Sequence, residues 1–350
     1  MSQFLETLIR PHILTLTPYS SARDEYCGKE GIFLDANENP YNSVLGKPFN
    51  RYPDPYQWEV KQKLSKIKGI KPESIFIGNG SDEAIDLLIK ATCEPKINNI
   101  VIMPPTYGMY KVCADIQQVE VKVANLTENF EIDLTTVKNT VDSQTKVIWI
   151  CSPNNPSGNS LKEEAILDII KSYPKVLVVV DEAYIDFASQ SSMISRIEEF
   201  ENLAVIQTFS KAWGMAGLRL GTAYARSELL QILNKIKYPY NLNQVTQQLL
   251  FEALDKVEQK NEYVAQINAE REILKAELQK LEIITKIYPS DSNQLLVKFI
   301  DAKAVFHYLL DKKIILRDRS NVVLCDNCIR ISIGTKEENQ TLLKELLNYN

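Results

Sequence analysis

The chain has 350 residues, 45% of them hydrophobic and 24% charged, with a formal net charge of −5. This length is enough for one large globular unit, or for a large domain with a smaller one. Without a basic stripe or tail, neither nucleic acid nor an anionic membrane is an expected partner.

The N-terminal region is expected to be an arm rather than a core element. The first thirty residues combine Pro11, Pro18 and Gly28 with few periodic apolar positions. We place this arm at residues 1–42 and expect it to pack with a C-terminal domain. Its first six residues lack the charged and apolar regions of a secretory signal.

Strand and helix patterns alternate over residues 43–240. A helix is predicted at 56–68, followed by a strand at 74–77 and a helix at 82–92 with Ser81 as a plausible N-cap. Further strands are expected at 99–103, 146–151, 176–180 and 204–208, and a further helix at 107–115. Continuous apolar strands are typical of a parallel sheet covered on both faces. The pattern therefore predicts a large α/β domain with a mostly parallel sheet and helices on both faces.

The character of the sequence changes near residues 238–242. A long charged helical stretch covers 243–281, strands are expected at 293–299 and 328–333, and helices at 302–311 and 336–347. We therefore predict a smaller α+β domain over residues 241–350.

The number and positions of the cysteines and histidines limit which metal or redox sites this chain could form. The six cysteines are scattered, which fits reduced thiols in a cytoplasmic protein better than a disulfide framework. Cys325 and Cys328 form a lone C-x-x-C, and His12 and His307 are the only histidines. Because a zinc site needs four ligands, we predict two ordinary thiols and no metal.

Two turns could bind a ligand. Gly80-Ser81-Asp82-Glu83 lies where a strand meets a helix, and amides at a helix N-terminus attract phosphate, although an ordinary capped helix would show the same pattern. Residues 152–158, Ser-Pro-Asn-Asn-Pro-Ser-Gly, follow a buried strand at the sheet edge where open α/β sheets bind ligands. A plain turn explains that composition equally well.

Two further segments supply a carboxylate and an amine. Asp181 ends a buried strand, where a carboxylate is costly unless it meets a cation, such as a protonated pyridine nitrogen. Lys211 follows another buried strand, between Thr208, Ser210 and Arg219. A desolvated lysine near other cations becomes a nucleophile and base. In isolation, Asp181 would be read as a salt-bridged residue and Lys211 as a surface charge.

The order of these four segments resembles the fold-type I, aspartate-aminotransferase-like family of pyridoxal 5'-phosphate enzymes, from about Leu16 to Gly334. Segments at 16–19, 35–40, 51–55, 104–110 and 314–318 look like those of the histidinol-phosphate aminotransferases within it. Ser157 departs from the family turn, which usually has Thr, but it keeps the hydroxyl.

The resemblance implies roles around the cofactor. Lys211 would form the aldimine with pyridoxal 5'-phosphate, Asp181 would pair with the pyridine nitrogen, and Tyr107 would stack on the ring. Asn155 and Tyr184 would hydrogen-bond the phenolic oxygen. The implied phosphate ligands are Ser81, Asp82, Thr208, Ser210, Arg219 and, from the neighbouring subunit of a homodimer, Tyr52.

The resemblance also implies a substrate and a reaction. Arg330 would bind the carboxylate of glutamate or the phosphate of histidinol phosphate, with Arg317, Tyr19 and Asn37 as further substrate ligands. The implied reaction is the ping-pong conversion of L-histidinol phosphate and 2-oxoglutarate to imidazole-acetol phosphate and L-glutamate, in histidine biosynthesis. The alternatives are an aminotransferase for aromatic amino acids and a phosphothreonine decarboxylase-like enzyme. A non-catalytic cofactor-binding regulator is disfavoured, because Lys211 is present.

Overall fold

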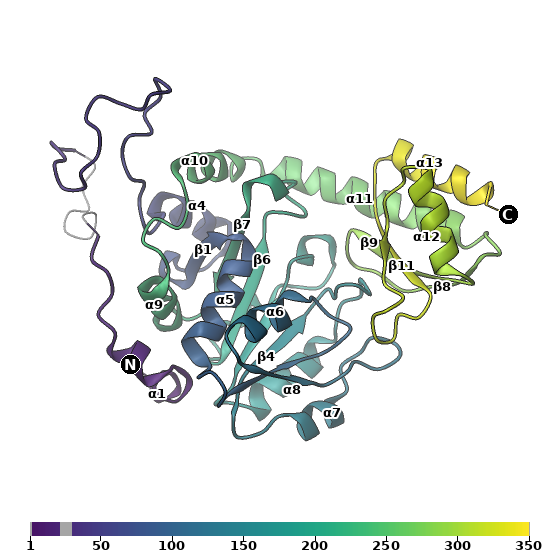
Figure 1. The fold of residues 1–350 in the computed structure, drawn as a ribbon, viewed down its shortest axis with the longest axis horizontal. Helices are drawn as coiled ribbons and strands as arrows, with labels where there is room; N and C mark the ends of the chain where they lie inside the picture. The colour runs from purple at the N-terminus through teal and green to yellow at the C-terminus, as the bar shows by residue number, and fades with distance from the viewer. Residues whose placement is uncertain (1, 22–29, 350) are drawn as a thin grey trace.

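A seven-stranded sheet forms the centre of the larger unit in the computed structural model, which describes residues 2–21 and 30–349 (Figure 1). Its strand order is β1-β7-β6-β5-β4-β2-β3. The strands are β1 (Ile75–Asn79), β2 (Asn99–Ile102), β3 (Glu120–Val123), β4 (Thr145–Cys151), β5 (Leu177–Asp181), β6 (Leu203–Thr208) and β7 (Leu220–Tyr224). Neighbours from β6 to β3 pair in parallel, whereas β7 pairs antiparallel with β6 and β1. The predicted mostly parallel sheet is confirmed.

Helices cover both faces of this sheet, as the continuous apolar strands predicted. On β5, Val178 and Val180 face a core shared with α4 (Trp58–Lys68), α7 (Leu134–Thr140) and α8 (Glu163–Ser172). Leu177 and Val179 face the opposite core, shared with α5 (Gly80–Thr92), α6 (Met109–Ile116) and α9 (Ser227–Ile236). Because successive side chains of a strand point to opposite faces, a strand buried on both sides is apolar throughout.

The start of α5 differs from the prediction in one detail that matters for function. Its N-cap is Asn79 without a side-chain cap, so the assignment of Ser81 as N-cap is wrong and Ser81 lies in the first turn. The Glu83 carboxylate instead accepts a hydrogen bond of 2.5 Å from the Asn79 backbone N–H. The N–H groups of this first turn have no partner within the helix, so they point outward as donors.

A four-stranded antiparallel sheet forms the smaller unit. Its order is β10 (Arg317–Asp318), β11 (Cys328–Ser332), β9 (Gln294–Phe299) and β8 (Ile284–Ile287). It packs with α11 (Val257–Leu278), α12 (Ala302–Asp311) and α13 (Lys336–Leu347) around a core of its own. These elements match the α+β pattern expected for the C-terminal region.

The predicted helical stretch 243–281 is two helices, α10 (Gln244–Ala253) and α11. Helix α10 packs against α4, and Leu250 and Leu254 are buried in the core of the larger unit. The transition between the units therefore lies near the start of α11 rather than at residue 241, because the apolar side of α10 is buried by the larger unit.

The first residues pack on the larger unit, which contradicts the expected position of the arm. Helices α1 (Gln3–Leu8) and α2 (Pro11–Thr15) lie at the opposite end of the molecule from the small unit (Figure 1). Leu5, Leu8 and Ile13 are buried with residues of α5 and α9, and Arg10 pairs with Glu94 at 2.9 Å. Leu5 and Leu8 are three residues apart in α1, so they lie on one face of that helix, and this core buries that face. Residues 22–29 of the predicted arm, including Cys27, lie outside the described residues.

Candidate active site

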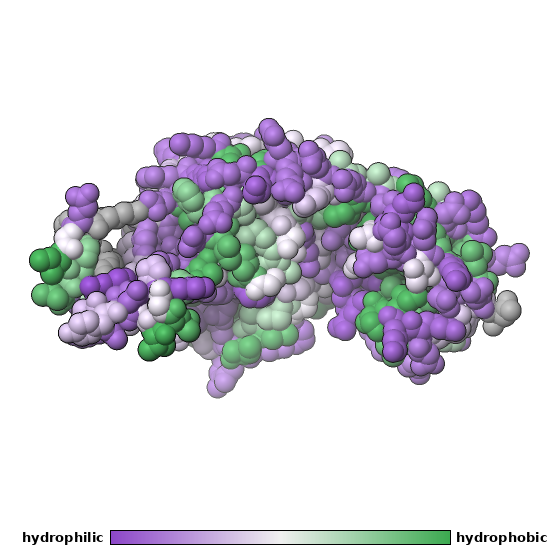
Figure 2. All heavy atoms as spheres, turned by 90° about the horizontal axis from the view of Figure 1, so that it is seen from above, coloured by the Kyte–Doolittle hydropathy of each residue, from purple (hydrophilic) through white to green (hydrophobic). Residues whose placement is uncertain are grey.

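The predicted chemical segments meet at one edge of the large sheet. Cys151 at the end of β4 pairs with Asp181 at the end of β5, and Asp181 pairs with Ile206 near the end of β6. Because these strands are parallel, the residues that follow them emerge side by side. Asn155, Asp181 and Lys211 therefore come together from three strands. The surface is hollowed between the two units (Figure 2).

A corner with several hydrogen-bond donors lies beside α5. Gly221 of β7 packs directly against the start of that helix, so a Cβ added there would lie 2.0 Å from the Ser81 backbone N. Gly80 donates its backbone N–H to the Arg219 carbonyl at 2.7 Å. The Arg219 Nη2 atom lies 3.3 Å from Asp82 Oδ2. First-turn amides, the positive end of the helix dipole and a guanidinium thus converge, which suits a phosphate.

Hydroxyl groups extend this corner towards Lys211. Thr208 Oγ1 donates to the Leu220 carbonyl at 3.2 Å and accepts from the Ser210 N–H at 3.1 Å. On the other side, the Tyr107 hydroxyl donates to Asp82 Oδ1 at 3.0 Å. The predicted phosphate ligands of this chain, together with Tyr107, therefore form one group.

Lys211 has the environment of a reactive amine. Its side chain is solvent-exposed, but partial desolvation and then the cations Arg330 and Arg219 lower its pKa. Its Nζ lies 5.7 Å from the centre of the Tyr184 ring. A lowered pKa leaves more of the amine neutral near pH 7, and the neutral amine is the nucleophile.

Asp181 is a buried carboxylate without an ion-pair partner among the described residues. Burial raises its pKa to about 6, despite hydrogen bonds from Tyr110 and from the Ala183 N–H. Ionising such a group is costly until a cation meets it. A protonated ring nitrogen would be that cation.

Arg330 links the small sheet to the turn after β4. Its Nη1 donates to Asn155 Oδ1 at 2.8 Å, while its buried Nε has no hydrogen-bond partner among the described residues. Tyr184 is buried beside it, and this burial raises the tyrosine pKa well above its usual range. Arg330 therefore contacts Asn155 through Nη1, while its Nε is a donor that no described residue uses.

Arg319 is a residue that the sequence analysis missed. Arg317 lies opposite Arg330 in the β10–β11 register, and two residues further along Arg319 donates its N–H to the Cys328 carbonyl. Its Nε is buried without a hydrogen-bond partner among the described residues, and desolvation followed by Arg330 and Arg317 lowers its pKa. The signal was present in the Arg-Asp-Arg spacing, because residues i and i+2 of an extended chain share a face.

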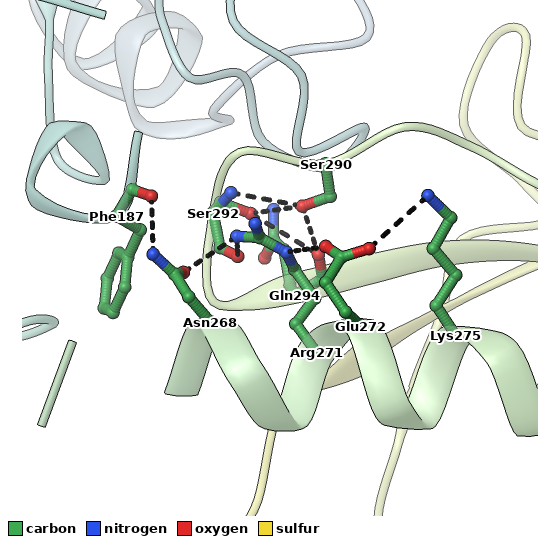
Figure 3. A network of polar contacts seen from close by, with 8 residues as sticks. All are labelled: Phe187, Asn268, Arg271, Glu272, Lys275, Ser290, Ser292 and Gln294. Atoms are coloured by element: carbon green, nitrogen blue, oxygen red, sulfur yellow. Dashed lines mark hydrogen bonds and ion pairs between the residues drawn. The ribbon is translucent and has the colours of Figure 1, made fainter. Parts of the chain in front are cut away.

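The small unit also fixes the turn at residues 152–158. The Asp291 N–H donates to the Gly158 carbonyl at 2.8 Å, and Gln294 Nε2 lies 3.4 Å from the Pro156 carbonyl. The loop that makes these contacts, at residues 290–294, is in turn held by α11, because Arg271 donates to the Ser292 carbonyl at 2.8 Å (Figure 3). The position of Asn155 therefore depends on contacts between the two units.

Three predicted ligands do not join the Lys211 group within one chain. Tyr52 stacks on Tyr240, with ring centres 4.4 Å apart, and lines a cavity of about 430 Å³ together with Asn37. Tyr19 is 74% exposed. All three belong to residues 16–21 and 30–52, which run outside the body of the larger unit (Figure 1).

Comparison with known proteins decides the family. A sequence profile described as aminotransferase class I and II matches residues 29–346. The chain belongs to the aminotransferase class I and II family. It is 50% identical, over the whole of both chains, to the histidinol-phosphate aminotransferase of Cytophaga hutchinsonii. The crystal structure of the histidinol-phosphate aminotransferase from Clostridium acetobutylicum is 25% identical, with a TM-score of 0.80 over 86% of this chain and 90% of that one.

The family confirms the predicted enzyme class and cofactor. Class I and II aminotransferases use pyridoxal 5'-phosphate. A structure of the Sinorhizobium meliloti histidinol-phosphate aminotransferase in complex with this cofactor shares the fold, with a TM-score of 0.78 over 97% of this chain and 98% of that one, at 20% identity. The residues present fit the cofactor: a buried carboxylate lacking a cation, an amine of lowered pKa and a phosphate-binding corner.

The two cysteines of the C-x-x-C are free thiols. Cys325 and Cys328 are both buried, and the Cys328 N–H donates to the Cys325 carbonyl at 2.9 Å. Within residues 2–21 and 30–349, no group of three or more His, Cys, Asp or Glu side chains could hold a metal ion. In the same residues no helix is both long and apolar enough to cross a membrane.

Proposed function

We propose that this aminotransferase converts L-histidinol phosphate and 2-oxoglutarate to imidazole-acetol phosphate and L-glutamate, a step of histidine biosynthesis. The observation that carries the proposal is the 50% identity with a curated histidinol-phosphate aminotransferase, which leaves no part of either chain unmatched. The cluster of Arg317, Arg319 and Arg330 supports an anionic substrate group.

Each residue at the sheet edge has a proposed task. Pyridoxal 5'-phosphate supplies an electron sink and carries the amino group between the two substrates. Lys211 would bind it covalently, and its freed Nζ would then move the proton at the substrate's α-carbon. Asp181 would hold the proton of the ring nitrogen. Asn155 and Tyr184 would orient the ring through its phenolic oxygen.

The phosphate corner would anchor the cofactor, with Tyr107 packed on the ring face. Ser81 and Asp82 would donate backbone N–H groups, Thr208 and Ser210 hydroxyls, and Arg219 its guanidinium. Such charge-assisted hydrogen bonds are the strong ones. The Asp82 carboxylate that now contacts Arg219 also binds the Tyr107 hydroxyl, so Asp82 would orient both ligands.

The arginine cluster would recognise both substrates. Arg330, fixed by Asn155, would bind the α-carboxylate of glutamate or the phosphate of histidinol phosphate. Arg317 and Arg319 would add positive charge on the phosphate side. A phosphate monoester carries more charge and more acceptor oxygens than a carboxylate, so it gains more from several guanidinium groups.

The protein would act as a homodimer in the cytoplasm. Tyr52 would reach the cofactor phosphate of the neighbouring subunit, with Tyr19 and Asn37 at the same interface. The exposed large apolar or aromatic side chains of the projecting N-terminal segment include Ile32, Leu34, Tyr41, Val44 and Leu45. Apolar patches of this kind mark protein–protein interfaces.

A substrate panel tests the proposal. Adding histidinol phosphate to the holoenzyme should remove the visible absorbance of the lysine-bound cofactor, and 2-oxoglutarate should restore it. Lys211→Ala should lose both that absorbance and turnover. Reaction with phenylalanine but not with histidinol phosphate would sink the assignment, and carbon dioxide release from phosphothreonine would favour a decarboxylase.

A further inference from the structure

The carboxylate of Asp181 has a second, fully buried partner that no step above uses. Tyr110, in the first turn of α6, donates its hydroxyl hydrogen to Asp181 Oδ2 at 2.5 Å. The backbone N–H of Ala183 donates to the other oxygen, Oδ1, at 3.0 Å. Each carboxylate oxygen accepts about two hydrogen bonds, so one acceptor position on each oxygen stays open to a ligand.

The packing of Tyr110 does not require its hydroxyl. The ring stacks on Trp149 with centres 4.8 Å apart and an interplanar angle of 13°, and it meets Tyr107 edge-on at 5.6 Å. A phenylalanine would make the same ring contacts. A buried hydroxyl costs free energy unless it is hydrogen-bonded, so the group at this position is explained by the bond it makes to Asp181.

We propose that Tyr110 is a positioning residue for the cofactor: its hydroxyl holds the Asp181 carboxylate ionised and oriented towards the ring nitrogen. The proposal rests on the role proposed above for Asp181, but not on the identity of the amino donor. Tyr110 would touch neither the cofactor nor the substrate. It would act only through Asp181.

The groups around Asp181 determine whether its pKa is raised or lowered. Burial raises the pKa of Asp181 to about 6, and the hydrogen bond from Tyr110 is the largest influence that lowers it. The other titratable groups around the carboxylate, from the elements packed against it, are Asp82, Tyr107, Cys151, Tyr184 and Lys211. Of these, Cys151 also meets the Tyr110 hydroxyl, and losing that contact would raise the already high pKa of the thiol and leave it neutral.

The pH dependence of cofactor binding follows from the direction in which Tyr110 shifts the pKa of Asp181. A ring cation binds ionised Asp181, so affinity should rise as the pH increases through about 6. Without the Tyr110 hydroxyl, the pKa of Asp181 rises and the gain in affinity starts at higher pH. The free cofactor's own ionisations are the same for every variant, so differences between variants report the protein.

The test measures the dissociation constant of pyridoxal 5'-phosphate for the apoprotein from pH 5 to pH 9. Tyr110→Phe should weaken binding about tenfold or more near neutral pH, the size of a lost charge-assisted hydrogen bond, and should move the pH profile upward. Tyr224→Phe is the matched control, since Tyr224 is also fully buried but lies in the core on the other face of the sheet. It should leave the dissociation constant unchanged.

A double-mutant comparison separates coupling from a general packing defect. In an Asp181→Asn background, Tyr110→Phe should change the dissociation constant less than twofold. If Tyr110→Phe fails to fold, 3-fluorotyrosine at position 110 keeps the shape and donates more strongly, so the pH profile should move downward. An unchanged profile with either replacement, or an equal loss in the Asp181→Asn background, would overturn the proposal, whether or not histidinol phosphate is the substrate.

Discussion

Gly221 fixes the position of the phosphate corner, and replacing it with alanine is the sharpest test of the site. It lies on β7 opposite Gly78 of β1 and Thr208 of β6, below the first turn of α5. A Cβ there would lie 2.0 Å from the Ser81 backbone N and 2.2 Å from the Gly80 carbonyl carbon. Both neighbours are backbone atoms, so no side-chain rotation can make room.

The magnitude follows from the displacement. Ordinary contacts of a Cβ begin near 3.4 Å, so the start of α5 would have to move by more than an ångström. Overpacking of this kind costs about 1–3 kcal/mol of unfolding free energy. A shift of about 1 Å in positioned groups costs on the order of a hundredfold in rate. Gly221→Ala should therefore lose about that factor in turnover and bind the cofactor more weakly.

Gly217→Ala is the matched control in the same segment. Gly217 lies in the short helix η4 (Ala216–Leu218), and its added Cβ would meet no atom within 4 Å. Thermal unfolding of the apoprotein and absorbance titration with pyridoxal 5'-phosphate measure both variants. If Gly221→Ala bound the cofactor as tightly as Gly217→Ala, the corner described here would not be the phosphate site.

Three further predictions concern substrate recognition, pH dependence and the N-terminal helices. Arg319→Gln should raise the KM for histidinol phosphate about tenfold or more, the size of a charge-assisted hydrogen bond, and Arg317→Gln less, because Arg317 is exposed; equal effects in steady-state kinetics would count against a phosphate role for Arg319. Burial raises the pKa of Glu182 to about 7, so its ionisation costs stability as the pH rises from about 4.5 through 7. Glu182→Gln should therefore flatten the fall in unfolding free energy over that range in denaturant titrations, and a slope equal to the parent's would contradict the assignment. Leu8→Ala should destabilise the protein by about 2–5 kcal/mol, because Leu8 is fully buried, whereas Leu16→Ala should change stability little at 44% exposure; similar melting temperatures for the two would refute the packing of α1.

Local patterns predicted five of the seven strands of the large sheet. Apolar runs such as Val176–Val180 located the buried strands, since only a strand covered on both faces is apolar at every position. The antiparallel strand β7 was not predicted, because its residues, Leu-Gly-Thr-Ala-Tyr, carry little apolar signal. The predicted place of the arm was wrong because α1 and α2, separated near Pro11, are too short to show a clear helical period, although α1 buries Leu5 and Leu8.

The sequence by itself predicted which residues gather at one edge of the large sheet, because their order along the chain follows the order of the strands whose ends they occupy. Lys211, Asp181 and Asn155 each follow a buried parallel strand, and parallel strands deliver such residues to one edge. Only the tertiary structure decided which distant groups tune them. The hydrogen bonds from the Tyr110 hydroxyl to Asp181 and from Arg330 to Asn155 join elements that are far apart in the chain, and no local pattern encodes such contacts.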